Sequence, residues 1–206
     1  GSYAVTASAG ALSQNFSLTN TPGNPAAILM LQGDAQTATV NTGYATALQV
    51  RVEDAYGNVV PGATVTFTPP GSGASISFSG ANSVVTDAGG LATAPAMTAN
   101  TTAGAFTVSA TAGAASANFN LTNMPDVPVA LSITGGNNQT AGAGTAFGAA
   151  LQARLTDAYG NGISGQPVTF TAPASGASGI FSSTSTNIQT VNTDAGGFAT
   201  SSTFTA

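Results

Sequence analysis

The sequence predicts an all-β protein, and three observations predict it. Apolar and polar residues alternate in short runs such as Leu48–Glu53 and Thr64–Thr68, which is the period of a strand with one buried face. Turn signals rich in Gly, Asn and Pro separate these runs, and no window has the spacing of an amphipathic helix. The third observation is an internal repeat, because the patterns of the first half return in the second.

Three blocks of sequence occur twice in the same order. The first two blocks return 103 residues later and the third returns 107 residues later. The pairs are Leu48–Asn58 with Leu151–Asn161, Val65–Thr68 with Val168–Thr171, and Thr86–Thr93 with Thr193–Thr200. The four additional residues lie in a Ser- and Gly-rich stretch around 175–185.

The start of the chain also repeats a later segment, because Asn15–Asn20 matches Asn118–Asn123 at the offset of 103. We therefore expect repeats of about 103 residues in a slice of a longer array that is cut out of phase. Residues 1–21 are expected to be the C-terminal hairpin of a preceding or neighbouring-subunit repeat. Residues 22–124 are expected to be a complete repeat, and residues 125–206 a second repeat without its last hairpin.

Each repeat is predicted to consist of short strands and turns. The expected strands of the complete repeat include Leu48–Glu53, Thr64–Thr68, Phe106–Ala110 and Asn118–Leu121. The expected turns lie at Tyr56–Asn58, Pro61–Gly62, Ala88–Gly90 and Ala112–Gly113. Several strands per repeat, with turns every ~8–12 residues, predict a two-sheet β-sandwich of the immunoglobulin type. Prolines at 22, 25, 125 and 128 are expected to stiffen the segments between repeats.

Composition excludes several classes of function. The chain has two cationic residues, both arginines, seven acidic residues and a net charge of −5, so it cannot neutralise a run of phosphates and nucleic acid is not an expected partner. Without His or Cys there is no usual zinc or haem site, no disulfide and no Cys or His nucleophile. No apolar run reaches 18 residues, so no membrane insertion is expected. We expect no enzyme activity and no cofactor.

The repeated blocks resemble a known family. The order Val-x-Asp-Ala-Tyr-Gly-Asn-x-x-Pro-Gly-Ala-Thr-Val-Thr-Phe-Thr, then Thr-Asp-Ala-Gly-Gly-Leu-Ala-Thr, then Gly-Ala-Phe-Thr-Val-Ser-Ala, is similar to the bacterial Ig-like domains of group 1. The second copy departs at 162–167, where Ser164 stands in place of Pro61. The resemblance implies an Ig-like sandwich in the extracellular stalk of a bacterial surface protein of the intimin and invasin kind, and it implies no catalytic residue.

Asp54, Asp157 and Asp126 are the candidate Ca²⁺ ligands, because carboxylate and amide oxygens bind this ion. Asp54 and Asp157 each precede Ala-Tyr-Gly-Asn, and Asp126 lies between repeats. We favour a turn in which Asp accepts hydrogen bonds from backbone N–H groups. Glu53 is not repeated in the second copy, and the counterpart of Asp126 is Gly23, so no shared carboxylate set is repeated.

The sequence leaves the environment of two kinds of side chain undecided. Arg51 and Arg154 occupy equivalent strand positions and either pair with a carboxylate on a neighbouring strand or are solvated. Tyr56, Tyr159 and Tyr44 are expected to be buried at loop corners. The alternative is an exposed sugar-binding platform, which the absence of Trp disfavours.

The expected hairpin at 2–20 offers Val5, Phe16 and Leu18 for burial at an assembly surface. Its insertion into the next molecule by strand addition would give a head-to-tail fibre of copies of the same subunit. The alternative is that the chain is cut from one covalent array. A different function, an adhesin module that binds a host or carbohydrate ligand, would use exposed loops such as Ala174–Asn187.

Overall fold

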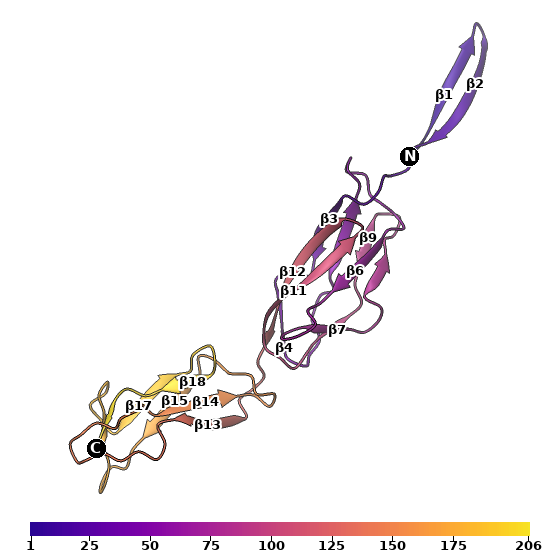
Figure 1. The fold of residues 1–206 in the computed structure, drawn as a ribbon. Helices are drawn as coiled ribbons and strands as arrows, with labels where there is room; N and C mark the ends of the chain where they lie inside the picture. The colour runs from indigo at the N-terminus through magenta and orange to yellow at the C-terminus, as the bar shows by residue number, and fades with distance from the viewer. The chain divides into compact units, whose positions relative to one another are not determined.

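The computed structural model describes all residues 1–206, and every regular element in it is a β-strand (Figure 1). The chain forms two compact units. The first holds residues 1–37, 43–98 and 105–122, and the second holds residues 38–42, 99–104 and 123–206. No helix with the length and apolar character needed to cross a bilayer is present.

The N-terminal hairpin consists of β1 (Ser2–Ala9) and β2 (Leu12–Thr19), which pair antiparallel. Gly10 occupies the first position of the two-residue turn with φ +60°, a conformation that favours glycine. The alternation of the sequence gives the hairpin one apolar face and one face of Ser, Thr, Asn and Ala. Every residue of both strands is exposed to solvent.

Besides the N-terminal hairpin, residues 22–124 form two facing sheets and a short two-stranded sheet. The three-stranded sheet has the order β3 (Ala27–Gln32), β5 (Gln49–Glu53), β9 (Leu91–Thr93). The five-stranded sheet has the order β4 (Gln36–Thr39), β12 (Ala115–Met124), β11 (Gly104–Ala112), β6 (Thr64–Thr68), β8 (Ser83–Val85). The small sheet pairs β10 (Met97–Ala99) with β7 (Ile76–Phe78).

The core of the first unit lies between the two larger sheets. Val50 of β5 and Val65 and Phe67 of β6 are fully buried, and so is Phe119 of β12. These residues belong to one cluster of buried side chains that draws on both sheets. Because the inward positions are those with period-two spacing in the sequence, the structure confirms the predicted all-β sandwich class.

The second unit has three small sheets. The first has the order β13 (Ala130–Gly135), β14 (Gln152–Thr156), β18 (Phe198–Thr200). The other two pair β15 (Pro167–Thr171) with β17 (Ile188–Asn192), and β16 (Ile180–Phe181) with β19 (Phe204–Thr205). Residues 125–206 contain no counterpart of β11 and β12, so β15 has a neighbouring strand on one edge only, whereas β6 has β8 and β11.

Candidate functional site

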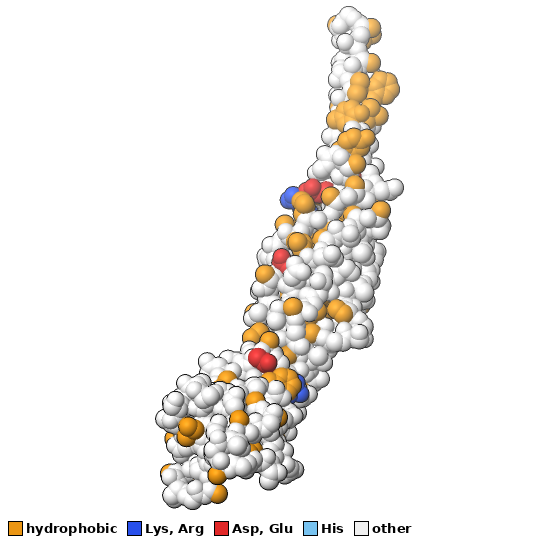
Figure 2. Space-filling model, turned by 60° about the vertical axis from the view of Figure 1, so that its left-hand side comes forward, with side chains coloured by type: hydrophobic (Ala, Val, Ile, Leu, Met, Phe, Trp, Pro, Cys, Tyr) orange, Lys and Arg blue, Asp and Glu red, His pale blue; other side chains and the backbone are white.

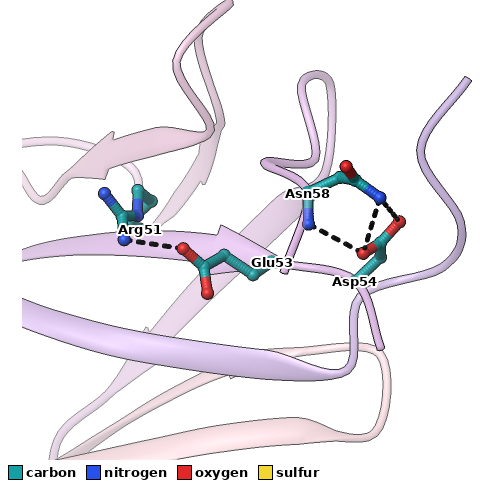
Figure 3. A network of polar contacts seen from close by, with 4 residues as sticks. All are labelled: Arg51, Glu53, Asp54 and Asn58. Atoms are coloured by element: carbon teal, nitrogen blue, oxygen red, sulfur yellow. Dashed lines mark hydrogen bonds and ion pairs between the residues drawn. The ribbon is translucent and has the colours of Figure 1, made fainter. Parts of the chain in front are cut away.

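The loop after β5 is organised by Asp54 (Figure 3). Its Oδ1 accepts the backbone N–H groups of Tyr56 and Asn58, each at 2.9 Å. Its Oδ2 accepts the N–H of Gly23 at 2.9 Å, and the Asn58 side-chain amide donates to both oxygens. The Gly23 N–H and the Asn58 amide hold the pKa of Asp54 well below its usual range. The carboxylate is therefore stabilised by N–H donors that fix the loop.

Asp157 repeats this arrangement in the second unit. Its Oδ1 accepts from the N–H groups of Tyr159 and Asn161, both at 2.9 Å, and its Oδ2 accepts from the Asn161 amide at 2.9 Å. Burial raises the pKa of Asp157, but the hydrogen bonds from Asn161, Asp126 and Tyr159 outweigh burial, and the net effect lowers that pKa. Both aspartates thus lie in turns of the kind that the sequence predicts.

The same two aspartates tie the preceding linker to the sandwich, a role that the sequence does not reveal. The N–H of Asp126 donates to Asp157 Oδ2 at 3.1 Å, as the N–H of Gly23 does to Asp54 Oδ2. Asp126 takes part through its backbone, and its own carboxylate accepts the N–H of Val127. Because the donor is a backbone group, the side chain at this position is free to differ, which explains Gly in one copy and Asp in the other.

The three candidate Ca²⁺ ligands do not form a joint cluster with other acidic residues. No group of three or more acidic side chains in the chain is arranged to hold a metal ion. Asp54 and Asp157 lie in separate units, and the oxygens of both carboxylates point to N–H donors. These N–H groups stabilise each carboxylate by hydrogen bonding.

The two copies of the Asp-Ala-Tyr-Gly-Asn loop differ in what they contact. Within the second unit, Asn161 Oδ1 accepts the N–H of Ala103 at 2.9 Å, and Asn161 Nδ2 donates to the carbonyl of Thr101 at 2.9 Å. The Tyr159 hydroxyl accepts from Asn41 Nδ2 at 3.1 Å. Tyr56, the counterpart of Tyr159, has no such contact and is 89% exposed.

The prediction that the loop tyrosines are buried is therefore wrong for Tyr56, and Tyr159 is also exposed, at 44%. The aspartate carboxylate fixes the backbone of this loop by accepting hydrogen bonds from N–H groups of the loop, so the loop closes without burying the ring. Tyr44 is half-buried against the core of the first unit, and burial raises its pKa to about 12.

The arginine prediction needs a similar correction. Arg51 Nη2 lies 2.6 Å from Glu53 Oε1, so its partner is on the same strand, two residues along the same face (Figure 3). In the second copy the position of Glu53 is a threonine, and Arg154 instead donates from Nε to the carbonyl of Gly196 at 2.9 Å. Its guanidinium also lies 5.3 Å from the ring centre of Phe198.

One face of the N-terminal hairpin is an exposed apolar surface. Tyr3 lies opposite Leu18, and Val5 lies opposite Phe16, so the four side chains form one patch. Figure 2 shows hydrophobic side chains gathered along this hairpin. We call Tyr3, Val5, Phe16 and Leu18 the hairpin patch.

The hairpin patch has buried counterparts 103 residues later. Val5, Phe16 and Leu18 are 45%, 60% and 43% exposed. Their counterparts Val108, Phe119 and Leu121 are 0%, 0% and 1% exposed in β11 and β12. The hairpin therefore has, at the same spacing, the residue types that are buried in β11 and β12.

The second unit carries a complementary feature. Leu48 and Phe67 are fully buried in the first unit, whereas their counterparts Leu151 and Phe170 are only half-buried. A groove of about 160 Å³ lies on these side chains, lined also by Ile133 and Ala153. Phe67, the counterpart of Phe170, packs against Phe119 of β12, so the groove corresponds to a surface that is covered in the first sandwich.

Comparison with known proteins gives a family match and distant structural likenesses. The model of the bacterial Ig-like domain (group 1) matches residues 28–124. Domains 4 and 5 of the S-layer protein SbsC are similar at 16% identity and TM-score 0.41, over 60% of this chain and 57% of that one. Domains 4–9 of SbsC are similar at 16% identity and TM-score 0.42, over 100% of this chain and 30% of that one.

The Escherichia coli adhesin FdeC is similar at 16% identity and TM-score 0.42, over 94% of this chain and 68% of that one. The chain thus spans little more than half of the first SbsC structure and under a third of the second. No curated protein sequence matches the chain.

Proposed function

Residues 28–124 belong to the bacterial Ig-like domains of group 1, and on that premise we propose that the chain is a non-enzymatic structural module of an extracellular bacterial stalk or filament. In this proposal residues 1–21, 22–124 and 125–206 are a donor hairpin, a complete Ig-like repeat, and a second repeat that accepts a hairpin. The repeats stack end to end, and other copies of the same repeat are the partners.

The observation that carries this proposal is the match between the hairpin patch and the open groove of the second unit. The patch has the residue types and spacing of the β11–β12 face, and the groove has the residue types that this face covers in the first sandwich. Fully burying a Val, Leu or Phe side chain contributes about 1.5–3 kcal/mol, so burial of the hairpin patch favours joining the two surfaces.

Strand addition also satisfies backbone groups. An edge strand such as β15 presents unpaired N–H and C=O groups that pair readily with an added strand. When the hairpin of each subunit binds the open sandwich of the next, the two contacting surfaces differ. Such a heterologous contact repeats from subunit to subunit and gives an open filament, not a closed ring. The same contact serves whether the hairpin comes from the same covalent array or from a separate subunit.

The low charge of the chain favours close packing of such a rod. Charged residues make up 4% of the sequence, so little like-charge repulsion opposes lateral contact.

Four aspartates accept hydrogen bonds from backbone N–H groups through their carboxylates. Two follow β5 and β14, and two lie in the Thr-Asp-Ala-Gly-Gly turns; they are Asp54, Asp157, Asp87 and Asp194. This use is structural, and we assign no general base.

Light scattering and negative-stain electron microscopy of the purified 206-residue chain test the proposal. We expect the average mass to rise with concentration and filaments to appear. The double variant Phe16→Ser, Leu18→Ser should remain at the mass of one chain. The matched control Ser13→Ala, Ser17→Ala changes the polar face of the same strand and should assemble like the original. A folded chain that stays monomeric at every concentration contradicts the self-assembly.

A second candidate function is a ligand-binding adhesin module, which the exposed ring of Tyr56 favours. The loop 174–187, which carries the four-residue insertion, is also exposed over most of its length. Glycan or host-surface binding that is lost in Tyr56→Ala while the filaments persist would support this role beside the structural one.

A further inference from the structure

We infer that the hairpin of one copy fills the open side of the second unit of another copy in one fixed register, with Phe16 seated against Phe170. This inference rests on the proposed head-to-tail assembly and specifies its contacts. Two sets of contacts in the first unit, both carried over by the repeat offset of 103, define the register.

The first set concerns the ring that enters the groove. In the first unit Phe119 packs against Phe67 with ring centroids 6.4 Å apart. The counterpart of Phe67 is Phe170, which lines the open groove with Leu151 and Ala153. The counterpart of Phe119 is Phe16, whose ring is 60% exposed. The groove thus lacks the ring that the hairpin carries.

Pairing of β11 with β6 gives the alignment along the strand. The partners in the first unit are Ser109 with Thr68, Ala110 with Phe67, and Thr111 with Thr66. The edge of β15 that corresponds to this side of β6 has no strand beside it. The counterparts of β11 lie 103 residues earlier, in the hairpin, and those of β6 lie 103 residues later, in β15. The same pairing therefore places Thr6 opposite Thr171, Ala7 opposite Phe170, and Ser8 opposite Thr169.

The second set lies on the other side of the β11–β12 pair. Asn120 of β12 donates its N–H to Asp34 Oδ1 at 2.8 Å, and its carbonyl accepts the N–H of Ala35 at 2.9 Å. Ala35 has φ 54°, a left-handed conformation that aims its N–H at the strand. This loop therefore recognises the backbone of one residue of β12.

The second unit carries the same loop without the strand. Asn138 has φ 55°, as Ala35 does, and it follows Asn137, the counterpart of Asp34. The counterpart of Asn120 is Ser17 of the hairpin. In the free chain the N–H of Asn138 donates to Asn137 Oδ1 at 3.0 Å. In the assembled state the N–H of Asn138 donates instead to the Ser17 carbonyl, and the N–H of Ser17 takes its place on Asn137 Oδ1. This contact needs the same register as the pairing of Thr6 with Thr171.

The loop at the edge of the groove has the same glutamine hydrogen bonds as the corresponding loop of the first unit. Gln139 Nε2 donates to the carbonyls of Gly136 and Ala149 at 2.8 and 2.9 Å, as Gln36 does to its own loop. Residues 139–142 correspond to β4, which lies beside β12 in the first unit, yet they form no strand here. We expect them to become a strand when the hairpin binds beside them.

Disulfide trapping tests the register, because the chain has no cysteine of its own. Chains carrying Thr6→Cys are mixed with chains carrying Thr171→Cys in a glutathione buffer, and the mixed dimer is quantified by mass spectrometry. The matched control mixes Ser2→Cys with Thr171→Cys. Ser2 lies four residues from Thr6 on the same face, about 13 Å away at ~3.3 Å per residue, beyond disulfide reach.

We expect the Thr6–Thr171 pair to give about tenfold more mixed dimer than the control. Light scattering on each mixture reports assembly separately. Assembly with equal trapping of both pairs, or with more trapping of the control, overturns the register and leaves the proposed function intact. Absence of assembly in every mixture overturns both.

Hydrogen exchange provides a second test that needs no cysteine. On assembly the amide of Asn138 should gain protection of about tenfold or more, and Phe16→Ala should remove that gain together with assembly. Ser13→Ala, on the polar face of β2, should keep both. Assembly without added protection at Asn138 contradicts the contact with Ser17.

Discussion

The ring of Phe119 packs on the ring of Phe67, with centroids 6.4 Å apart and both side chains fully buried. Phe16 stands in the equivalent place of the N-terminal hairpin, where its ring contacts solvent. Phenylalanine at the same repeat position is therefore buried in β12 and exposed in the hairpin.

This difference predicts that the same substitution has a large effect at Phe119 and almost none at Phe16. Phe119→Ala removes a buried ring and should lower the free energy of unfolding of the first sandwich by about 3–5 kcal/mol. Phe16→Ala should leave that free energy within about 0.5 kcal/mol, because its ring lies on the exposed hairpin and is not part of the core of that sandwich. Urea unfolding at concentrations where the chain is monomeric measures both. Equal losses in the two variants would mean that the hairpin already packs within the isolated chain.

The Asp54 and Asp157 loops predict a loss of stability in acid. Hydrogen bonds lower the pKa of both carboxyls in the folded chain below the value near 3.9 expected when unfolded. Their contribution to stability is therefore complete above that value and is lost as the pH falls toward the lower folded pKa. The double variant Asp54→Asn, Asp157→Asn should be less stable at neutral pH and should lose less between pH 5 and about 2.

Thermal unfolding of the original chain and this variant across that pH range gives the comparison. The expected result is that the two melting temperatures converge as the pH falls. Parallel curves would show that other groups cause the acid sensitivity.

Tyr44 predicts a second pH dependence, at the alkaline end. Burial raises its pKa to about 12, so the folded chain resists loss of the hydroxyl proton. The contribution of the neutral form to stability is present below the unfolded pKa of about 10 and is lost as the pH rises through about 12. Ultraviolet titration should show a late tyrosinate component that Tyr44→Phe removes. If that component persists in Tyr44→Phe, another tyrosine is responsible for it.

Much of the fold follows from sequence because its signals are local. Alternation identifies the strands around Val50 and Val65, and the repeat places a hairpin at 104–123, as β11 and β12 confirm. The turn role of Asp54 also follows, because Asp before a Gly turn accepts nearby N–H groups. These features depend on residues close together in the chain.

The interactions that sequence did not predict depend on backbone groups or on distant segments. The linker N–H of Gly23 that binds Asp54 has no side-chain signature. The partner of Arg51 is Glu53 on its own strand, since two residues on one face of a strand lie close enough to pair. Tyr56 is exposed. The contacts of its ring depend on the surrounding loops, and the Asp-Ala-Tyr-Gly-Asn block does not predict where those loops lie.

Gly90 and Gly113 form a matched pair for testing backbone strain. Both have positive φ, +72° and +58°. A Cβ at Gly90 would lie 2.9 Å from the carbonyl oxygen of Val52 and 3.0 Å from Val59 Cβ, whereas one at Gly113 would meet nothing within 4 Å. Gly113→Ala should cost about 1–2 kcal/mol from conformation alone. Gly90→Ala should cost more, because its backbone neighbours cannot move aside; equal costs in urea unfolding would contradict the clash.

The Arg51–Glu53 pair predicts a small effect that depends on salt. The two charges lie 2.6 Å apart, yet the Arg51 side chain is 40% exposed, so solvent screens them. The Nε of Arg51 is buried without a hydrogen bond, which further limits the value of the pair. Exposed ion pairs contribute up to about 1 kcal/mol, so Glu53→Gln should lower the free energy of unfolding by no more than this.

At about 1 M salt the Debye length falls to about 3 Å, and the difference between Glu53→Gln and the original chain should largely disappear. Thr156→Val at the equivalent position of the second copy provides the control, because no charge is removed there and its effect should not change with salt. Urea unfolding at low and high salt measures both. A loss in Glu53→Gln that persists at high salt would show that Glu53 stabilises the sheet by packing its side chain, and that its charge contributes little.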